Sequence, residues 1–496
     1  MIKKEILTQN YYFRLALIII ILSMISFGLI LKKKPENEKK VTIRIDVKNN
    51  KQKSILEKHL TKKINLDKVE YIEAAVNWKQ FFQLQKEGLN PVLQVEVNRT
   101  KLVDPYFHTF SEITYLLKSF RLQYPDIFHL EKIGKGTKNH LPIWAVKISD
   151  NPHIDEKEPA VLFNGLHHAK ELLGAEVCLY LIDYLCKNYN HKPEVKYWVD
   201  KTEIWIIPVL NPDGHYLVMD TKKSPQFWRK NLRDNNSNGF FELEKDGVDL
   251  NRNYDYNWDC DSDGDPRSWH YRGPYPFSEF ETQAIRNLTF REKFVFNLDF
   301  HSYGEVILYP WENFTPPPDR ELVINVAKEM AKQIKRRAKL GHYSIRPLNG
   351  KLGQCSVWMH GKAGVLSYIV EIGDCHLPNG RDIHEIVEQN AKAAFYVLDR
   401  LFRSAIKGTI INAYTRIPIS AEIEILKYSS LLVANPVSDL STGFYYRIVQ
   451  PGIYSIKFSA SGFRTKVIHS VIVESDKVTS LNVELYPIED ILPTEN

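Results

Sequence analysis

Cysteine is scarce in this chain of 496 residues, which contains only five. So few cysteines, and an odd number of them, exclude a disulfide-stapled fold. Spacing leaves one pairing open, between Cys355 and Cys375, but we favour free thiols because spacing alone does not test geometry.

The sequence also lacks an excess of either positive or negative charge. The formal net charge is only +6, and no basic stretch alternates with aromatic residues, so nucleic acid is not an expected partner.

One long apolar run, Leu15–Leu31, lies near the amino terminus between lysine-containing flanks. We favour an uncleaved membrane anchor within residues 1–40 over a cleaved signal peptide, because no small-x-small cleavage site follows the run. Under either interpretation the remainder is exported, as a membrane-anchored protein or as a secreted or periplasmic one. Charges on both flanks leave the orientation open.

The remaining length exceeds that of one ordinary domain, and the composition is that of globular protein, with 44% hydrophobic and 25% charged residues. Residues 41–104 read as a small α+β module. Val41–Val47 and Leu93–Asn98 alternate apolar and polar residues as half-buried strands do, and 54–59 reads as helical. The sequence does not decide whether this module is a pro-segment or a spacer.

Residues 105–405 alternate strands with helices. Several of the strands are apolar on both faces, which favours an α/β fold with a mixed, largely parallel central sheet flanked by helices. The expected strands are 143–148, 161–166, 203–210, 295–300 and 366–372. Helices are expected to begin near 107 and at 172, and two more are expected at 319–340 and 383–402. Ser111 or Thr109 is the expected cap of the first. Asn211–Gly214 reads as a turn.

Residues 406–490 have a different pattern, with short alternating strands separated by turns such as Pro451-Gly452 and Ser461-Gly462. This spacing predicts a small C-terminal β-sandwich. The segment contains no cluster of histidines, cysteines or carboxylates. We therefore expect it to be a packing or interaction module.

The candidate site centres on His168-Ala169-Lys170-Glu171, between the strand that ends at 166 and the helix that begins at 172. In an open α/β sheet, ligands bind at the carboxyl ends of the strands. An imidazole and a carboxylate three residues apart, without a thiolate, suit a catalytic zinc ion. Alone, the motif is better explained as a surface histidine beside a solvated glutamate, so other residues must complete the site.

Two further residues occupy comparable places. His301 follows directly on the strand 295–300, and two histidines with one glutamate are a recognised catalytic zinc set. Glu371 lies within the apolar strand 366–372. A carboxylate buried without a partner is costly, so Glu371 must face a polar cleft, pair with a cation, or act in acid-base chemistry with a raised pKa.

Cationic and amide side chains complete this set. Arg229 and the pair Asn251-Arg252 offer donors suited to a carboxylate or an oxyanion, although both arginines also fit surface ion pairs of little energetic value. The acidic run 259–265 superficially resembles a calcium loop but lacks the closing glutamate of an EF-hand. We therefore favour a solvated loop there.

Six motifs in order resemble those of zinc metallocarboxypeptidases of the carboxypeptidase A/T type, over residues 107–402. They are Gly165–Glu171, Asn211–Gly214, Trp228–Lys230, Asp249–Asn253, His301–Tyr303 and Val370-Glu371. The C-terminal segment resembles the transthyretin-like domain attached to carboxypeptidases of the N/E type.

This resemblance implies a metallocarboxypeptidase-like fold and a role for each residue. His168, Glu171 and His301 hold one zinc ion per chain, and Glu371 activates water. Arg229 stabilises the oxyanion, while Asn251 and Arg252 bind the terminal carboxylate of a peptide or protein substrate. Two alternatives stay open: a peptidase of peptidoglycan stem peptides with the same site, and a non-catalytic peptide-binding homologue.

Three positions depart from the family pattern. Lys170 stands where the family usually has arginine, which keeps the charge near the substrate but loses the planar fork. Asn349 stands where a mobile tyrosine is expected, unless Tyr343 replaces it through a loop shift. Ser356 stands at the base of the specificity pocket, which favours substrates with neutral or apolar side chains.

Overall fold

The computed structural model describes residues 40–47, 50–59, 71–77, several positions between 80 and 93, 106–219, 226–337 and 339–488. The chain divides into two compact units, Met1–Glu96 and Val97–Asn496. The apolar run Leu15–Leu31 and the end of the strand expected at 93–98 lie outside the described residues. Within the described ranges, none of the helices combines the length and the apolar character that a membrane crossing requires.

The first unit contains a three-stranded antiparallel sheet with β1 (Lys40–Asp46) in the centre. β2 (Tyr71–Asn77) and β3 (Val92–Leu93) pair with it on either side. The helix α2 spans Asn50–His59. The alternating pattern predicted β1 and the helix. It missed β2, whose middle contains two alanines, a residue type that is uncommon in strands.

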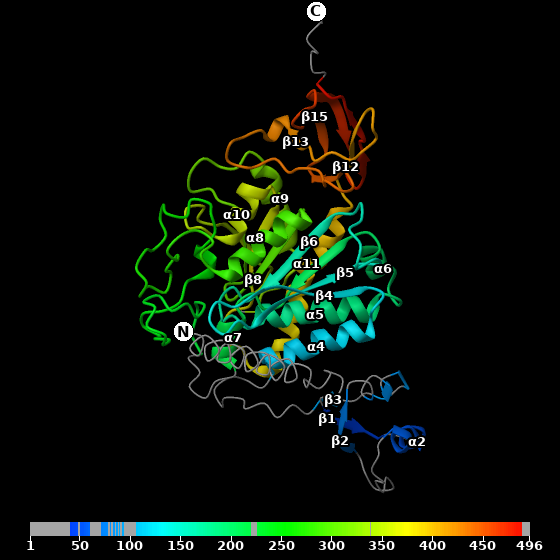
Figure 1. Cartoon of the computed structure of the whole chain (residues 1–496), viewed down its shortest axis with the longest axis vertical. Helices are drawn as coiled ribbons and strands as arrows, with labels where there is room; N and C mark the ends of the chain where they lie inside the picture. Colours follow the sequence, from blue (N-terminus) through cyan, green and yellow to red (C-terminus); the bar gives the residue numbers. More distant parts are fainter. Residues whose placement is uncertain are drawn as a thin grey trace, which may run out of the picture. The chain divides into compact units, whose positions relative to one another are not determined.

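The second unit is built around an eight-stranded sheet in the order β10-β9-β11-β8-β6-β7-β5-β4. Figure 1 labels four of its strands, β4, β5, β6 and β8. The strands are β4 Phe128–Lys135, β5 Pro142–Ile148, β6 Ala160–Gly165, β7 Glu203–Ile207, β8 Phe296–His301, β9 Val306–Tyr309, β10 Ser344–Pro347 and β11 Leu366–Glu371. The central strands β11, β8, β6 and β7 run parallel. β5 is antiparallel to β7, β4 to β5, and β9 to β11, so the predicted mixed sheet with a parallel centre is confirmed.

Helices cover both faces of this sheet. They are α4 Phe110–Gln123, α5 Leu173–Asn188, α6 Pro193–Val199, α7 Pro212–Met219, α8 Phe280–Glu292, α9 Arg320–Ala331, α10 Cys355–Ala363 and α11 Gly380–Leu401. Apolar residues of α4, α5, α9 and α11 share a core with one face of the sheet, and those of α8 and α10 share a core with the other. Burial on both sides explains the strands that are apolar throughout. Thr109, one of the two predicted caps, begins α4 in a capping box with Glu112.

Two local predictions are wrong. The expected turn at Asn211–Gly214 is the first turn of α7, because Pro212 suits a first helical position and the Asn211 side chain accepts the Gly214 N–H at 3.0 Å. The helix expected from 319 to 340 ends at Ala331. The chain reverses beyond it, since Ile334 accepts the N–H of Tyr343 at 3.0 Å, a tertiary pairing that helical periodicity does not reveal.

After α11, two small sheets enclose an apolar core of their own, as the alternating pattern of this segment predicted. One contains β14-β12-β17, with β18 also paired to β12, and the other contains β13-β15-β16. The strands are β12 Ala405–Asn412, β13 Glu422–Ile425, β14 Phe444–Ile448, β15 Gly452–Ser459, β16 Lys466–Val473, β17 Val478–Ser480 and β18 Val483–Leu485. An ion pair of 2.8 Å between Lys293 and Asp439 joins this part to the segment between α8 and β8.

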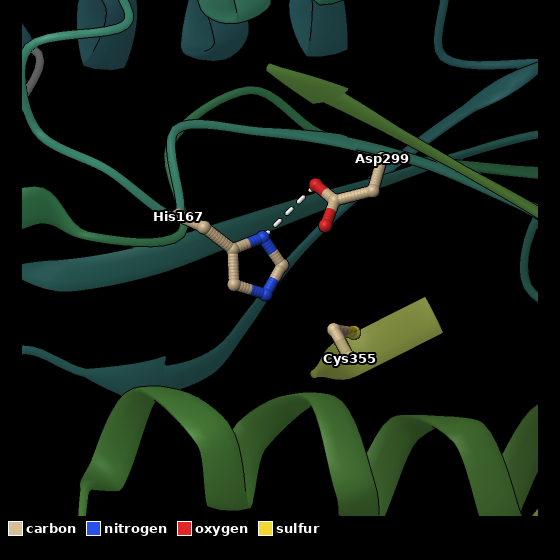
Figure 2. Close-up of side chains that lie close together, drawn as sticks. All are labelled: His167, Asp299 and Cys355. Atoms are coloured by element: carbon tan, nitrogen blue, oxygen red, sulfur yellow. Dashed lines mark hydrogen bonds and ion pairs between the residues drawn. The ribbon is translucent and has the colours of Figure 1, made fainter. Parts of the chain in front are cut away.

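The carboxyl ends of β6, β8 and β11 meet at one edge of the sheet. His301 is the last residue of β8, and it pairs in register with Glu371, the last residue of β11. α5 begins close to β8 because Gly174 has no side chain: a Cβ there would lie 2.5 Å from the carbonyl oxygen of Phe300. The same edge also buries an Asp299–His167 pair (Figure 2).

Candidate active site

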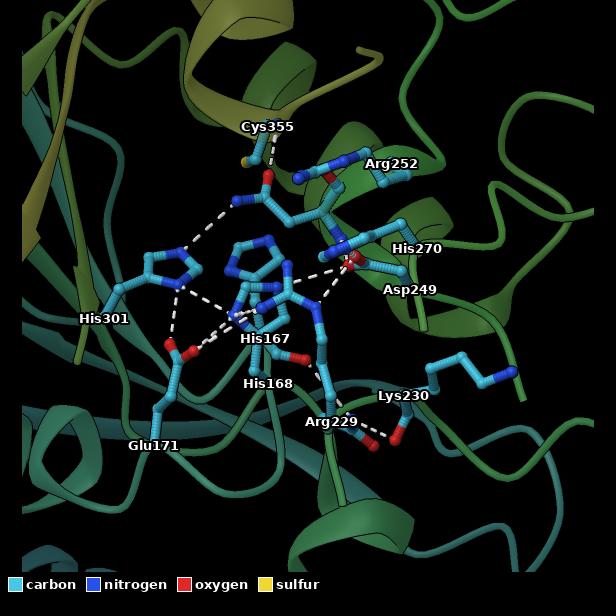
Figure 3. Close-up of polar contacts among 12 residues, drawn as sticks. His167, His168, Glu171, Arg229, Lys230, Asp249, Arg252, His270, His301 and Cys355 are labelled. Atoms are coloured by element: carbon cyan, nitrogen blue, oxygen red, sulfur yellow. Dashed lines mark hydrogen bonds and ion pairs between the residues drawn. The ribbon is translucent and has the colours of Figure 1, made fainter. Parts of the chain in front are cut away.

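The structure brings together His168, Glu171 and His301, which the sequence had placed at two separate strand ends (Figure 3). One oxygen of Glu171 lies 2.8 Å from Nδ1 of His168, and the other lies 2.8 Å from Nδ1 of His301. The two Nδ1 atoms are 3.1 Å apart. All three side chains are buried, and their ligand atoms lie within 4.8 Å of one another.

A second carboxylate lies behind each imidazole. Nε2 of His168 is 3.2 Å from Asp249, and Nε2 of His301 is 2.9 Å from Asp299. Such partners fix the orientation of a histidine ring and strengthen it as a metal ligand. The sequence analysis missed both aspartates, although Asp299 carried the same signal as Glu371, a carboxylate in an otherwise apolar strand.

The charges around these rings act in opposite directions. Burial lowers the pKa of His168, and the neighbouring Arg229 lowers it further. Burial also lowers the pKa of His301, but the carboxylates of Asp299 and Glu171 outweigh it and raise this pKa well above the usual value. Burial would raise the pKa of Glu171, yet the two imidazoles bring it well below its ordinary range. The carboxylates around the two imidazoles therefore favour a positive charge between His168, Glu171 and His301.

The donor set fits a divalent metal ion. Two imidazole nitrogens and a carboxylate, with no thiolate among them, suit zinc in a site with an open fourth position. Both histidines turn Nδ1 toward the shared space and use Nε2 for an aspartate, which leaves the correct nitrogen of each ring for an ion.

Glu371 lies beside this group at the end of β11. Burial raises its pKa to about 7, and the negative charge of Glu171 adds to the effect. A carboxyl group with a pKa near neutrality can both accept and donate a proton at physiological pH. The raised pKa agrees with one of the possibilities that its place in a buried strand left open, and the acid-base role itself stays a prediction.

Arg229 contacts the same group through its guanidinium. Its Nε donates to Asp249 at 2.9 Å, while Nη1 lies 3.3 Å from Nδ1 of His168 and 3.7 Å from Glu171. Burial would lower the pKa of Arg229, but Asp249 and Glu171 raise it, so the guanidinium stays charged. It therefore presents a fixed positive charge to the same space.

Asn251 and Arg252 form a short helical turn, Leu250–Arg252, whose cap is Asp249. The Asn251 side-chain oxygen accepts the N–H of Cys355 at 2.8 Å, and Arg252 donates to the Asn251 carbonyl at 2.7 Å. Asn251 Nδ2 lies 3.5 Å from the His301 ring, so the pair is next to the histidine-glutamate group as expected.

The three departures from the family pattern lie in different surroundings. Lys170 is half-buried, and burial lowers its pKa, with Arg229 adding to the effect. Ser356 is fully buried in α10, and its hydroxyl has no hydrogen-bond partner among the described residues. Tyr343 is buried and its hydroxyl accepts the N–H of Gly373 at 2.9 Å, so it is committed to the core and does not replace Asn349. Asn349 itself accepts hydrogen bonds within an exposed loop.

The other residues considered from sequence do not contribute to the site. All five cysteines are free thiols, so Cys355 and Cys375 are not paired. In the acidic run 259–265, Asp265 pairs with Arg267 at 2.8 Å. Within the part of the chain that the structure describes, none of the carboxylates of this run belongs to a group that could hold a metal.

Comparison with known proteins agrees with this geometry. Residues 113–393, more than half of the chain, match the zinc carboxypeptidase family. The chain belongs to this family. Membership implies zinc as the metal and carboxypeptidase as the class of hydrolase.

Individual relatives are distant. Human carboxypeptidase D is 25% identical over 405 residues, which cover 77% of this chain and 27% of that protein. A zinc carboxypeptidase of Saccharothrix mutabilis subsp. capreolus is 34% identical over 216 residues, 41% of this chain and 47% of that one. This chain therefore spans about a quarter of the carboxypeptidase D relatives it matches.

Among solved structures, carboxypeptidase A of Helicoverpa armigera superposes with a TM-score of 0.53 at 21% identity, covering 73% of this chain and 97% of that one. At that identity the likeness concerns the fold. It agrees with the mixed central sheet and its flanking helices.

Proposed function

We propose that this zinc carboxypeptidase homologue is an active peptidase that removes the C-terminal residue of peptides or proteins. The observation that carries the proposal is the convergence of His168, Glu171 and His301, with Arg229 in contact with Glu171 and with Glu371 within their electrostatic influence. A pseudoenzyme would not need to keep all of these groups, so we do not favour a purely peptide-binding role.

In this proposal His168, Glu171 and His301 hold one zinc ion per chain. When bound, the ion supplies an electrophile that acidifies water and polarises a carbonyl oxygen. Glu371 accepts the proton of the attacking water and then donates it to the leaving amine, a double role suited to its pKa of about 7. Arg229 donates to the oxyanion of the tetrahedral intermediate, and Asp249 holds its guanidinium in place.

Asn251 and Arg252 bind the substrate's free carboxylate through an amide donor and a guanidinium fork. Because they lie next to the histidine-glutamate group, a peptide anchored there presents its last peptide bond to Glu371. Lys170 adds positive charge near the entrance, and Ser356 leaves the base of the side-chain pocket neutral. We therefore propose a preference for neutral or apolar terminal residues.

A peptidase of cell-wall stem peptides is the second candidate, since an exported, anchored enzyme would encounter such substrates. We propose export by way of residues 1–40, either as an anchor or as a cleaved signal. We further propose a pro-segment or spacer at 41–104, a catalytic domain at 105–405 and a transthyretin-like domain at 406–490.

The deciding experiment compares one peptide with a free C-terminal carboxylate and the same peptide with a C-terminal amide. We expect the wild type to lose most of its kcat/KM on the amide, and Arg252→Ala to lose activity on the free acid while changing little on the amide. An enzyme that cleaves both peptides equally well does not recognise the terminal carboxylate, and the exopeptidase proposal would then be wrong. Profiling the last residue in a peptide library would test the role of Ser356.

A further inference from the structure

A row of buried polar side chains runs from the back of the site into the core. Nε2 of His301 lies 2.9 Å from one oxygen of Asp299. The other oxygen lies 2.9 Å from Nδ1 of His167, as Figure 2 shows. Nε2 of His167 is in turn 2.8 Å from the hydroxyl of Tyr254. Asp299, His167 and Tyr254 have no solvent exposure, and His301 has only 2%.

The chemistry of these groups fixes the direction of each hydrogen bond. An ionised carboxylate only accepts, so both imidazoles donate to Asp299, His301 from Nε2 and His167 from Nδ1. Each oxygen of Asp299 has one imidazole nitrogen as its partner, so the carboxylate accepts from both rings. His167 then offers a lone pair at Nε2 for the Tyr254 hydroxyl, and Nδ1 of His301 remains on the side of Glu171, where its lone pair would bind an ion.

A second interpretation assigns His167 and Asp299, together with the sulfur of Cys355, to a metal site of their own, because their ligand atoms lie within 4.8 Å of one another. The sulfur ligand argues against it. Burial raises the pKa of the Cys355 thiol well above its usual value, and the nearby Asp299 adds to this, so the thiolate that a metal requires is disfavoured.

We propose that Asp299 and His167 are positioning residues for His301: they set its ring orientation and tautomer so that Nδ1 faces the metal, with Tyr254 anchoring the far end. The inference rests on the proposed zinc site. Asp249 does the same for His168, but it also binds Arg229. Among the described residues, the side-chain hydrogen-bond partners of Asp299 are His301 and His167, so a substitution of Asp299 tests the orientation of His301 without removing a contact of Arg229.

The test measures the zinc dissociation constant of the full chain by competition with a chelator. Partners of metal-bound histidines typically contribute about 10- to 100-fold in affinity, so Asp299→Asn should weaken zinc binding by about that factor. His167→Leu should weaken zinc binding less, because Asp299 still contacts His301 but loses the hydrogen bond from His167 that fixes its position. His167→Asn, whose amide can replace the Nδ1 donor, should remain within about threefold of wild type.

Ser367→Ala provides a matched control. Ser367 is buried on the neighbouring strand β11 and accepts a hydrogen bond of 2.8 Å from Asn297, two residues before Asp299. The substitution removes one buried hydrogen bond in the same sheet without contacting any proposed ligand. We expect it to lower the melting temperature like the other variants but to leave zinc affinity unchanged, which separates positioning from general stability.

The inference is wrong if Asp299→Asn and His167→Leu both bind zinc within about twofold of wild type while their melting temperatures fall. It is also wrong if wild type holds two zinc ions and one of them is lost in Cys355→Ser, since His167 and Asp299 would then be ligands. Failure of the zinc site itself looks different: wild type would bind no zinc, or Glu171→Ala would bind it as tightly as wild type.

Discussion

Glu371→Gln should separate the two functions that the proposed site combines, metal binding and proton transfer. The substitution keeps the size and the hydrogen-bonding shape of the side chain but removes its capacity to accept a proton. General acid-base catalysis typically contributes about 100- to 10,000-fold, so kcat/KM should fall by about that factor, or by about 3–5 kcal/mol. The zinc content should stay at one per chain, because Glu371 is not among the three proposed ligands.

The same substitution should stabilise the metal-free protein at alkaline pH. A pKa of about 7 in place of the usual 4.5 means that the fold disfavours this carboxylate by about 3 kcal/mol. The unfolded chain releases the proton above its own pKa while the folded chain keeps it until about pH 7, so stability falls as pH rises through that window. Glutamine carries no such cost. Metal-free Glu371→Gln should therefore unfold at a higher temperature than wild type at pH 8, and at a similar temperature at pH 4.

The assays are peptide hydrolysis and calorimetry on the chelator-treated protein. In the zinc-loaded wild type, activity should rise with pH as Glu371 ionises, at a pH below 7 because a dication beside Glu171 favours the carboxylate. The residual activity of Glu371→Gln should lack this acid limb. If the variant keeps activity within about fivefold of wild type, or retains the same acid limb, Glu371 is not the general base.

Three further predictions concern other parts of the second unit. Burial raises the pKa of Glu281 to about 8, and the negative charge of Glu279 adds to the effect. The stability of the protein should therefore fall as pH rises from about 4.5 to about 8. Glu281→Gln can still form a hydrogen bond with Thr137, so its melting temperature should exceed that of wild type at pH 9 and equal it at pH 5. Removal of metal by a chelator should lower the melting temperature, and added zinc should restore it. The reason is that zinc at 100 times its dissociation constant stabilises the folded protein by about 2.7 kcal/mol. A melting temperature that does not change on chelation would exclude a metal site in the folded protein. Asn349→Tyr should lower KM severalfold if the exposed loop can close over a substrate, whereas an unchanged KM would show that the loop does not reach it.

The sequence predicted those parts of the site that depend on strand ends. His168 and His301 each follow an apolar run, and parallel neighbours in a sheet bring such ends together, so their proximity followed from the fold class. Glu371 was identified differently, as a carboxylate within an apolar strand, and the structure places it at the end of β11. It did not predict Tyr343, because only the reversal of the chain after Ala331 buries that side chain and ties its hydroxyl to Gly373. Local periodicity contains no information about such a return.

The two aspartates were missed for a related reason. Each becomes functional only through a partner far away in sequence: Asp249 through His168, and Asp299 through both His301 and His167. Charge pattern along the chain does not predict those contacts. The buried position of Asp299 in β8 was nevertheless a usable signal, since an unpaired buried carboxylate is costly and must have a partner.

The charge balance of the finished site gives an independent reason to expect a dication. Three carboxylates contact the two imidazoles, those of Glu171, Asp249 and Asp299, and one guanidinium does, that of Arg229. With neutral imidazoles these four groups carry a net charge of −2, which the nearby Arg252 offsets in part at Asp249. The remaining negative charge is costly in a low-dielectric interior without a counter-charge. The raised pKa of His301, due to Asp299 and Glu171 against the effect of burial, is one compensation available to the metal-free fold. A divalent ion would supply the counter-charge in place of that proton, so the carboxylates that hold the histidines in place also favour a cation between them.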